Sequence, residues 1–177
     1  NIGIDDYKGG QLAADYFLKK GHKTLGFVGP FTKIGGVITK RYQGFTDTLA
    51  KHHISLSPDH VYDMEKMEPS EIIDSILQDN CPPSGLFVFS DEITLQLSNI
   101  ASKKNLAIPS RLSLIGFDDL PSFCTTFDML TTIHQDIYRK AEITCKILFE
   151  HIADPDRPSE NVTLDVRLVE RNSVSTQ

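Results

Sequence analysis

Strand-like and helix-like segments alternate along most of this chain, and this alternation restricts its fold more than any other feature. Short apolar runs that stop at turns predict buried strands, and apolar residues three or four positions apart predict helices. The predicted strands are residues 2–4, 24–29, 60–63, 85–89 and 112–117, and the predicted helices are residues 9–20, 39–51, 69–77 and 92–104. Such regular alternation indicates an α/β fold: a doubly wound parallel sheet with helices on both faces.

The alternation stops after Asp119. A loop containing Pro and Ser leads to Thr131-Thr132-Ile133, and a helix is predicted from about Asp136 to Ile152. Apolar residues then alternate at Val162, Leu164, Val166 and Leu168, as in a half-buried strand or a hairpin. The last part of the chain is therefore expected to be organised differently from the rest.

Composition and charge exclude several classes of protein. The 177 residues are 40% hydrophobic and 24% charged, which is ordinary for a soluble protein, and no apolar run approaches the roughly 20 residues of a membrane span. The formal net charge of -6 argues against nucleic-acid binding by this chain alone, because phosphate binding depends on Lys and Arg. No signal peptide is visible, and the chain begins inside a predicted strand without Met, so we expect a fragment of a longer protein.

Motifs for catalysis, metals and cofactors are missing from the sequence. Cys81, Cys124 and Cys145 are odd in number and form no C-x-x-C pair, which predicts free thiols in a reducing cytoplasm and no zinc site. Gly29–Gly36 resembles a phosphate loop, but no G-K-[ST] follows, and G-x-G-x-x-G, G-x-S-x-G and H-E-x-x-H are absent. We therefore predict a binding protein that has no catalytic residue, metal site or cofactor.

Polar residues follow three predicted strands: the loop after Gly29, the pair Ser90–Asp91, and the pair Asp118–Asp119. The carboxyl ends of parallel strands meet at one edge, where open α/β sheets bind ligands. Asp91 has an alternative role as a helix N-cap. No helix pattern starts at Asp119, so one of the last two carboxylates is expected to face a ligand, with a structural turn as the alternative.

Arg41 lies in the first turn of the predicted 39–51 helix, where a cation opposes the helix dipole. An Arg at this position is explained if its planar guanidinium binds a ligand with paired acceptors. The alternative is a solvated Arg beside Lys40.

Seven segments in a fixed order carry a resemblance to a known family. They include R-Y-Q-G-F, which matches R-x-x-G-F, then I-P-S-R-L-S-L-I-G-F-D-D, which matches V-P-x-D-[IL]-S-V-[IV]-G-[FY]-D-D, and L-T-T-I-H-Q, which matches L-T-T-[IV]-x-Q. The seven segments are residues 2–10, 18–23, 41–45, 87–91, 108–119, 130–135 and 168–173. In this order they resemble the effector-binding domain of LacI-type transcriptional regulators.

The resemblance implies a type I periplasmic-binding-protein-like fold with a small effector, a sugar or sugar derivative, between two subdomains. Residues 1–133 would form the C-terminal subdomain, and residues 134–177 a helix and terminal strands that return to an N-terminal subdomain mostly absent here. The implied ligand-binding residues are Arg41, Asp118, Ser90, Met64 and Gln135. Ser90 stands where the family usually has Asn, and Met64 where it has an aromatic residue that stacks on the sugar.

The implied partners are the effector, a second copy in a homodimer, and DNA, which would be bound only through a headpiece missing from this chain. Two other interpretations remain: an extracytoplasmic sugar-binding protein of a transport system, and a small α/β enzyme. The 136–152 helix carries an apolar face formed by Ile137, Ala141, Thr144, Cys145, Leu148 and Ile152. This face would lack its packing partners, because most of the N-terminal subdomain is absent.

Overall fold

The structure of the protein, a computed structural model, describes residues 1–31, 36–120 and 129–177. Its centre is a six-stranded sheet with the strand order β3-β2-β4-β5-β6-β8. The first strands in this order run parallel to their neighbours: β3 (Val61–Asp63), β2 (Leu25–Gly29), β4 (Gly85–Val88), β5 (Ser113–Asp118) and β6 (Thr132–Gln135). The edge strand β8 (Val166–Val169) pairs antiparallel with β6.

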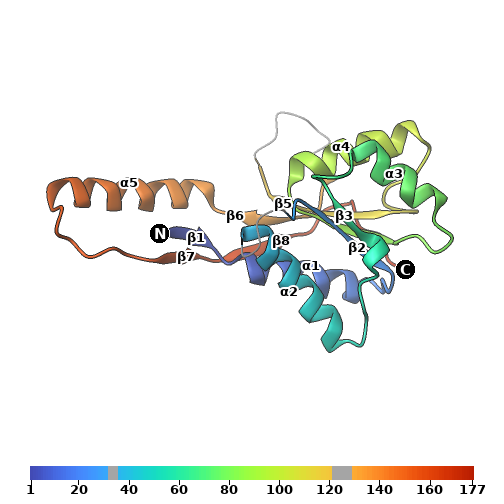
Figure 1. Cartoon of the computed structure of the whole chain (residues 1–177), viewed down its shortest axis with the longest axis horizontal. Helices are drawn as coiled ribbons and strands as arrows, with labels where there is room; N and C mark the ends of the chain where they lie inside the picture. Colours follow the sequence, from blue (N-terminus) through green and yellow to red (C-terminus); the bar gives the residue numbers. More distant parts are fainter. Residues whose placement is uncertain (32–35, 121–128) are drawn as a thin grey trace.

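Helices cover both faces of this sheet, which confirms the predicted doubly wound fold (Figure 1). One face carries α1 (Asp6–Lys19) and α2 (Val37–Lys51), and the other carries α3 (Pro69–Gln78) and α4 (Asp91–Lys103). Because each strand is covered on both faces, its residues are apolar almost continuously. Phe27 and Phe87 join an aromatic core under α1 and α2, while Val28, Leu86 and Val88 join an aliphatic core under α3 and α4.

Two helices begin before the apolar periodicity does, because a polar side chain caps each of them. Asp5 accepts a hydrogen bond from the backbone N–H of Lys8, so α1 starts at Asp6 and not near Gly9. Ser90 accepts one from Ile93, so α4 starts at Asp91. The cap of α4 is therefore Ser90, and the alternative role of Asp91 as the cap is wrong.

Two glycines let α1 and α2 cross in backbone contact. A Cβ atom on Gly10 would lie 2.0 Å from the carbonyl oxygen of Arg41, and one on Gly44 would lie 1.9 Å from that of Tyr7. Both distances are far below van der Waals contact, so a larger residue would force the helices apart. The close crossing brings the first turn of α1 against the first half of α2.

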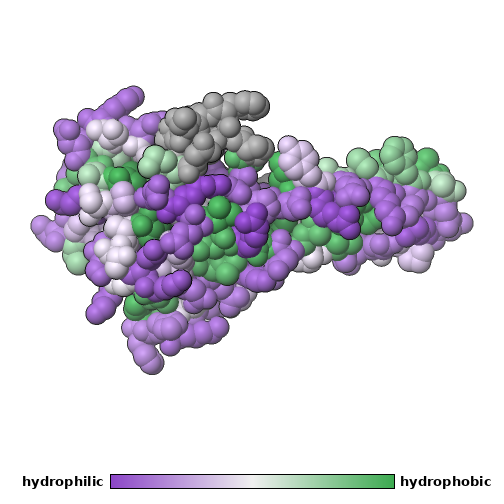
Figure 2. Space-filling view, turned by 180° about the vertical axis from the view of Figure 1, so that it is seen from behind, coloured by the Kyte–Doolittle hydropathy of each residue, from purple (hydrophilic) through white to green (hydrophobic). Residues whose placement is uncertain are grey.

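A narrow arm projects from the compact body (Figure 1). It consists of the helix α5 (Ile137–Ala153) beside a two-stranded parallel sheet of β1 (Ile2–Ile4) and β7 (Val162–Leu164). Within the described chain every residue of α5 keeps solvent exposure; Leu148 is 56% exposed and Ile152 is 66% exposed. Figure 2 shows hydrophobic side chains along this arm. The predicted apolar face of the helix is thus uncovered, apart from the half-buried Ile137.

The alternating residues 162–168 do not form a hairpin. Asp165 separates two strands that enter different sheets: β7 pairs with β1 in the arm, and β8 pairs with β6 in the body. Ser173 and Val174 are also buried in the body. The end of the 134–177 segment therefore lies with residues 1–133, while the division into two subdomains stays a prediction.

Parts of two expected loops lie outside the described residues. These are residues 32–35 of the loop after Gly29 and residues 121–128, which include Cys124. Cys81 and Cys145 are free thiols, as predicted, and the structure shows that both are exposed.

Candidate functional site

The carboxyl ends of β2, β4 and β5 meet at one edge of the sheet, because these strands run parallel. Gly29, Ser90 and Asp118 therefore come together at the edge that the sequence predicts for ligand binding. Arg41 reaches the same edge from α2, since its guanidinium carbon lies 3.4 Å from the centre of the Phe117 ring. Arg41 and Asp118 thus lie at one end of the sheet.

Arg41 is a buried ion-pair partner and not a solvated surface residue. Its Nε donates to Oδ1 of Asp6 at 2.8 Å, and the two residues are 7% and 4% exposed. Its Nη1 donates to the carbonyl oxygen of Phe89, the residue before Ser90. The face of the guanidinium stacks on Phe117 in a cation–π contact. Three different contacts therefore fix the orientation of the group.

Asp118 ends β5 in a conformation that L-residues rarely adopt, with φ at 119°, and the φ of Asp119 is also positive, at 53°. Strained backbone of this kind persists only where surrounding contacts hold it, and it clusters at functional sites. The Oδ1 of Asp118 accepts a hydrogen bond of 2.6 Å from Nε2 of Gln135. Burial raises the pKa of the Asp118 carboxyl, although Arg41 and Gln135 favour its ionised form.

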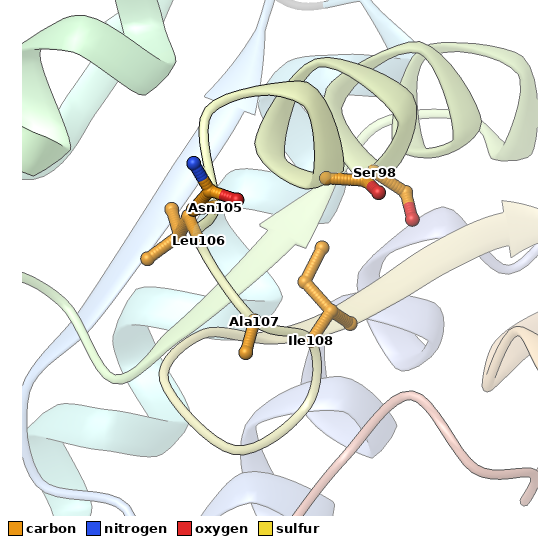
Figure 3. A pocket seen from close by; sticks show the side chains of 6 residues that line it. Ser98, Asn105, Leu106, Ala107 and Ile108 are labelled. Atoms are coloured by element: carbon orange, nitrogen blue, oxygen red, sulfur yellow. The ribbon is translucent and has the colours of Figure 1, made fainter.

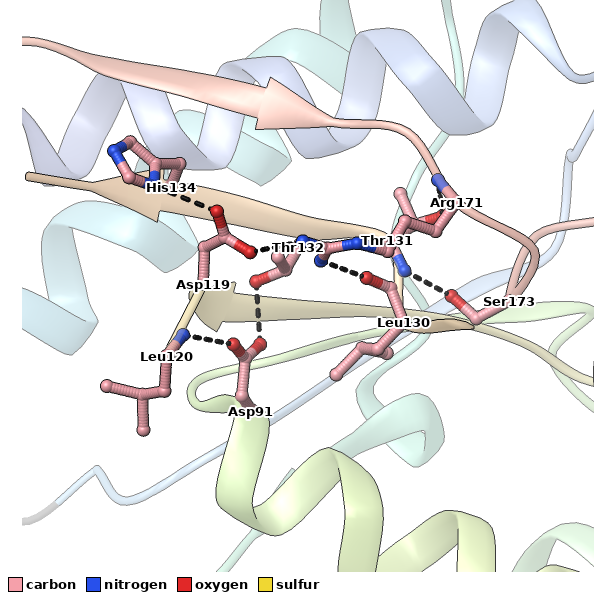
Figure 4. Close-up of polar contacts among 9 residues, drawn as sticks. All are labelled: Asp91, Asp119, Leu120, Leu130, Thr131, Thr132, His134, Arg171 and Ser173. Atoms are coloured by element: carbon pink, nitrogen blue, oxygen red, sulfur yellow. Dashed lines mark hydrogen bonds and ion pairs between the residues drawn. The ribbon is translucent and has the colours of Figure 1, made fainter. Parts of the chain in front are cut away.

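Asp119 takes part in a charged network with His134 and Arg171 (Figure 4). One carboxylate oxygen accepts from Nη2 of Arg171 at 2.6 Å, and the other pairs with Nδ1 of His134 at 2.9 Å. Burial opposes the ionisation of Asp119, but the hydrogen bonds from Arg171 and His134 outweigh it and lower the pKa. Of the two adjacent carboxylates, Asp119 therefore ties β5 to β6 and the C-terminal tail, and Asp118 is the one near Arg41.

Asp91 is a buried carboxyl just behind this edge, 1% exposed (Figure 4). It accepts hydrogen bonds from the hydroxyl of Thr132 at 2.6 Å and from the backbone N–H of Leu120 at 3.3 Å. Burial raises its pKa to about 6. Gly116 leaves room for it, because a Cβ there would lie 2.2 Å from Oδ1 of Asp91. Asp91 thus joins the start of α4 to β6.

The five ligand-binding residues predicted from the sequence are not equally placed. Arg41, Asp118 and Gln135 form one group, because Gln135 bonds to Asp118 and the charge of Arg41 acts on Asp118. The hydroxyl of Ser90 is engaged in capping α4. Met64 follows β3, where its backbone N–H donates to Gly29 and its side chain packs partly against the aliphatic core. The binding roles of all five stay predictions.

The sequence did not predict the contacts that two polar residues make at this edge. Asp6 orients Arg41, and Asp119 holds His134 and Arg171. A signal for Asp6 was present, because the helix start carries two adjacent carboxylates and capping requires one of them. The pairing of Asp119 with a residue 52 positions away had no local signal.

Comparison with known proteins identifies the fold family. Residues 14–174 match the model of the periplasmic binding protein-like domain. The chain belongs to this family. Its resemblance to the effector-binding domain of LacI-type regulators is confirmed by relatives in both sequence and structure.

The relatives in sequence are repressors. The chain is 29% identical over 173 residues to the HTH-type transcriptional repressor PurR of Mannheimia succiniciproducens, covering 96% of this chain and 51% of that protein. It is 31% identical over 151 residues to the PurR repressor of Actinobacillus pleuropneumoniae serotype 5b, covering 84% of this chain and 44% of that protein. The chain therefore spans about half the length of these relatives.

The relatives in structure are LacI family regulators. One from Enterococcus faecium, solved with bound ribose, superposes with a TM-score of 0.85 at 27% identity, covering 99% of this chain and 65% of that one. Another from Enterococcus faecalis V583, also with bound ribose, gives a TM-score of 0.84 at 28% identity, covering 99% of this chain and 63% of that one.

This periplasmic-binding-protein-like domain also has pockets away from the candidate site. A cavity of about 480 Å³ lies at the end of α4, so it opens at the opposite edge of the sheet, and its lining is uncharged: Ser98, Ser102, Asn105, Leu106, Ala107 and Ile108 (Figure 3). Among the described residues, no group of three or more His, Cys, Asp or Glu could hold a metal ion. Across the same residues, we find no helix that combines the length and apolarity needed to cross a membrane.

Proposed function

We propose that this domain is the effector-sensing part of a LacI-type transcriptional regulator that works in the cytoplasm. A small sugar-like effector binds at the edge formed by Arg41, Asp118 and Gln135 and controls DNA binding by a headpiece outside these 177 residues. The observation that carries the proposal is the buried guanidinium of Arg41, which three contacts hold in a fixed orientation beside Asp118. A fixed donor fork next to a carboxylate suits a ligand with adjacent hydroxyl groups, which both donate and accept.

The relatives support this proposal. The curated relatives are named transcriptional repressors, and two LacI family neighbours carry ribose. The projecting arm also fits the proposal, because its uncovered apolar face would pack against the rest of a longer protein. In the regulator, an effector acts by binding one arrangement of the two subdomains more tightly than the other. The expected homodimer stays a prediction.

The first experiment identifies the effector. Full-length regulator, purified without added sugar, is denatured, and mass spectrometry of the released small molecules shows what the site retains. Titration calorimetry with that molecule, or with a panel of monosaccharides beginning with D-ribose, then measures the affinity. The proposal would be contradicted if the protein bound neither a retained molecule nor any monosaccharide of the panel.

Arg41 is then tested in the same assay. Arg41→Ala is a poor test, because Arg41 is buried against Asp6 and its removal would strand that carboxylate at a cost of about 3–5 kcal/mol. Arg41→Lys is the better variant, because it keeps the charge for Asp6 and loses the planar fork. We expect at least tenfold weaker effector binding with retained fold. Arg111→Lys, the same substitution at an exposed residue of the opposite edge, is the matched control.

A further inference from the structure

The charge of Arg41 is already neutralised inside the protein. Asp6 lies 2.8 Å from Nε of Arg41, and both side chains are at least nine-tenths buried. An anionic ligand gains most from a guanidinium that has no other counter-charge. When Asp6 already neutralises Arg41, an anionic ligand meets a pair with no net charge, and the carboxylate of Asp6 repels it. A phosphate or carboxylate bound to Arg41 would lie beside the buried carboxylate of Asp6.

A second carboxylate strengthens this effect. Asp118 faces Arg41 from β5, and the negative charge of Asp6 acts unfavourably on its ionised form. Lys140, from the start of α5, is the second cation that acts on Asp118, and Asp91 adds another negative charge behind it. The charge of Arg171 is matched by Asp119. Among the described residues, the edge around Arg41 therefore carries no excess of positive charge.

The hydrogen-bonding groups that remain suit a neutral ligand. Arg41 has five N–H donors, of which one contacts Asp6 and one contacts the carbonyl oxygen of Phe89. Asp118 offers carboxylate acceptors beside them, and Gln135 holds one of its oxygens. Donors and acceptors side by side match hydroxyl groups, whereas a phosphate ester carries acceptors that Asp118 and Asp6 would repel.

We propose that Asp6 determines the ligand class of this site: by pairing with Arg41, it restricts the effector to neutral, hydroxyl-bearing molecules and excludes phosphorylated or carboxylated ones. The inference rests on the proposed function, because it assigns specificity to the same effector site. Asp6 acts through Arg41 and so is a positioning residue. A purely structural role would make Asp6 variants less stable without giving them a new affinity for anions.

The test measures anion binding and does not require the effector to be known. Full-length wild-type protein and the Asp6→Asn variant are titrated with inorganic phosphate at constant ionic strength, and binding is read from thermal unfolding. Asn keeps an oxygen that accepts from Nε of Arg41, so the guanidinium stays oriented while the competing charge is gone. Asp15→Asn, on the exposed face of the same helix, makes the same charge change away from the site.

We expect Asp6→Asn to bind phosphate at least tenfold more tightly than wild type and Asp15→Asn to behave as wild type. The gain should vanish in the double variant Asp6→Asn/Arg41→Gln. Equal phosphate affinity in wild type and Asp6→Asn, or a gain that survives loss of Arg41, would overturn the inference.

Should Asp6→Asn fail to fold, the wild-type protein decides the matter with D-ribose 5-phosphate and inorganic phosphate. Binding of either anion by wild type overturns the inference, and lack of a response to both supports it. Failure to find any bound sugar would instead count against the proposed function, because the phosphate titration reads only the charge at Arg41.

Discussion

The buried carboxyl of Asp91 makes the stability of this domain depend on pH in a direction opposite to that of most carboxylates. Its pKa is raised from 3.8 to about 6 because burial disfavours the charged form. The folded protein therefore holds the proton of Asp91 more tightly than the unfolded chain does. Stability from this group is fully present below pH 4 and is lost as the pH rises from about 4 to about 6.

The magnitude follows from the size of the shift. Each pKa unit corresponds to about 1.36 kcal/mol, so ionised Asp91 costs about 3 kcal/mol of folding free energy above pH 6. Asp91→Asn removes this cost. Its amide oxygen can still accept from Thr132, but its NH₂ group meets the N–H of Leu120, which costs roughly 1 kcal/mol at every pH.

We therefore expect Asp91→Asn to be more stable than wild type by about 2 kcal/mol at pH 8 and less stable by about 1 kcal/mol at pH 4. Urea unfolding followed by circular dichroism between pH 4 and 8 measures the difference, since the sequence has no Trp for fluorescence. Asp15→Asn is the exposed control and should show no such change. A stability difference between Asp91→Asn and wild type that stays constant over this range would refute the reasoning.

Two further predictions concern packing. Gly44→Ala should lower the melting temperature by several degrees, because its Cβ would lie 1.9 Å from the carbonyl oxygen of Tyr7 and overpacking costs about 1–3 kcal/mol; an unchanged melting temperature would contradict the backbone contact between α1 and α2. The isolated 177-residue chain should self-associate through the uncovered face of α5, because burial of a large apolar side chain contributes about 1.5–3 kcal/mol. Light scattering should show less association for Leu148→Lys/Ile152→Lys, and a wild-type monomer at all concentrations would count against this account.

Local sequence patterns were sufficient to predict the main features of the fold. Periodic apolar residues placed the helices α1 to α4, and apolar runs placed the parallel strands β2, β4 and β5, because strands covered on both faces are apolar almost throughout. Parallel topology alone then brought Ser90 and Asp118 to one edge. Helix starts were less predictable, since Asp5 and Ser90 extend α1 and α4 beyond their apolar residues through single side-chain hydrogen bonds.

The role of each charged residue was decided only by tertiary structure. Arg41 and Asp6 are 35 positions apart, and their pairing depends on the contact between α1 and α2 at Gly10 and Gly44. The sequence places Asp118 and Asp119 side by side, but the turn after β5 directs one toward Arg41 and the other toward Arg171. The electrostatics of a carboxylate depend on burial and on partners that are distant in the chain, and neither has a local pattern. The sequence by itself thus determined where a ligand site could form, and the packing of the helices on the sheet decided which charges it presents.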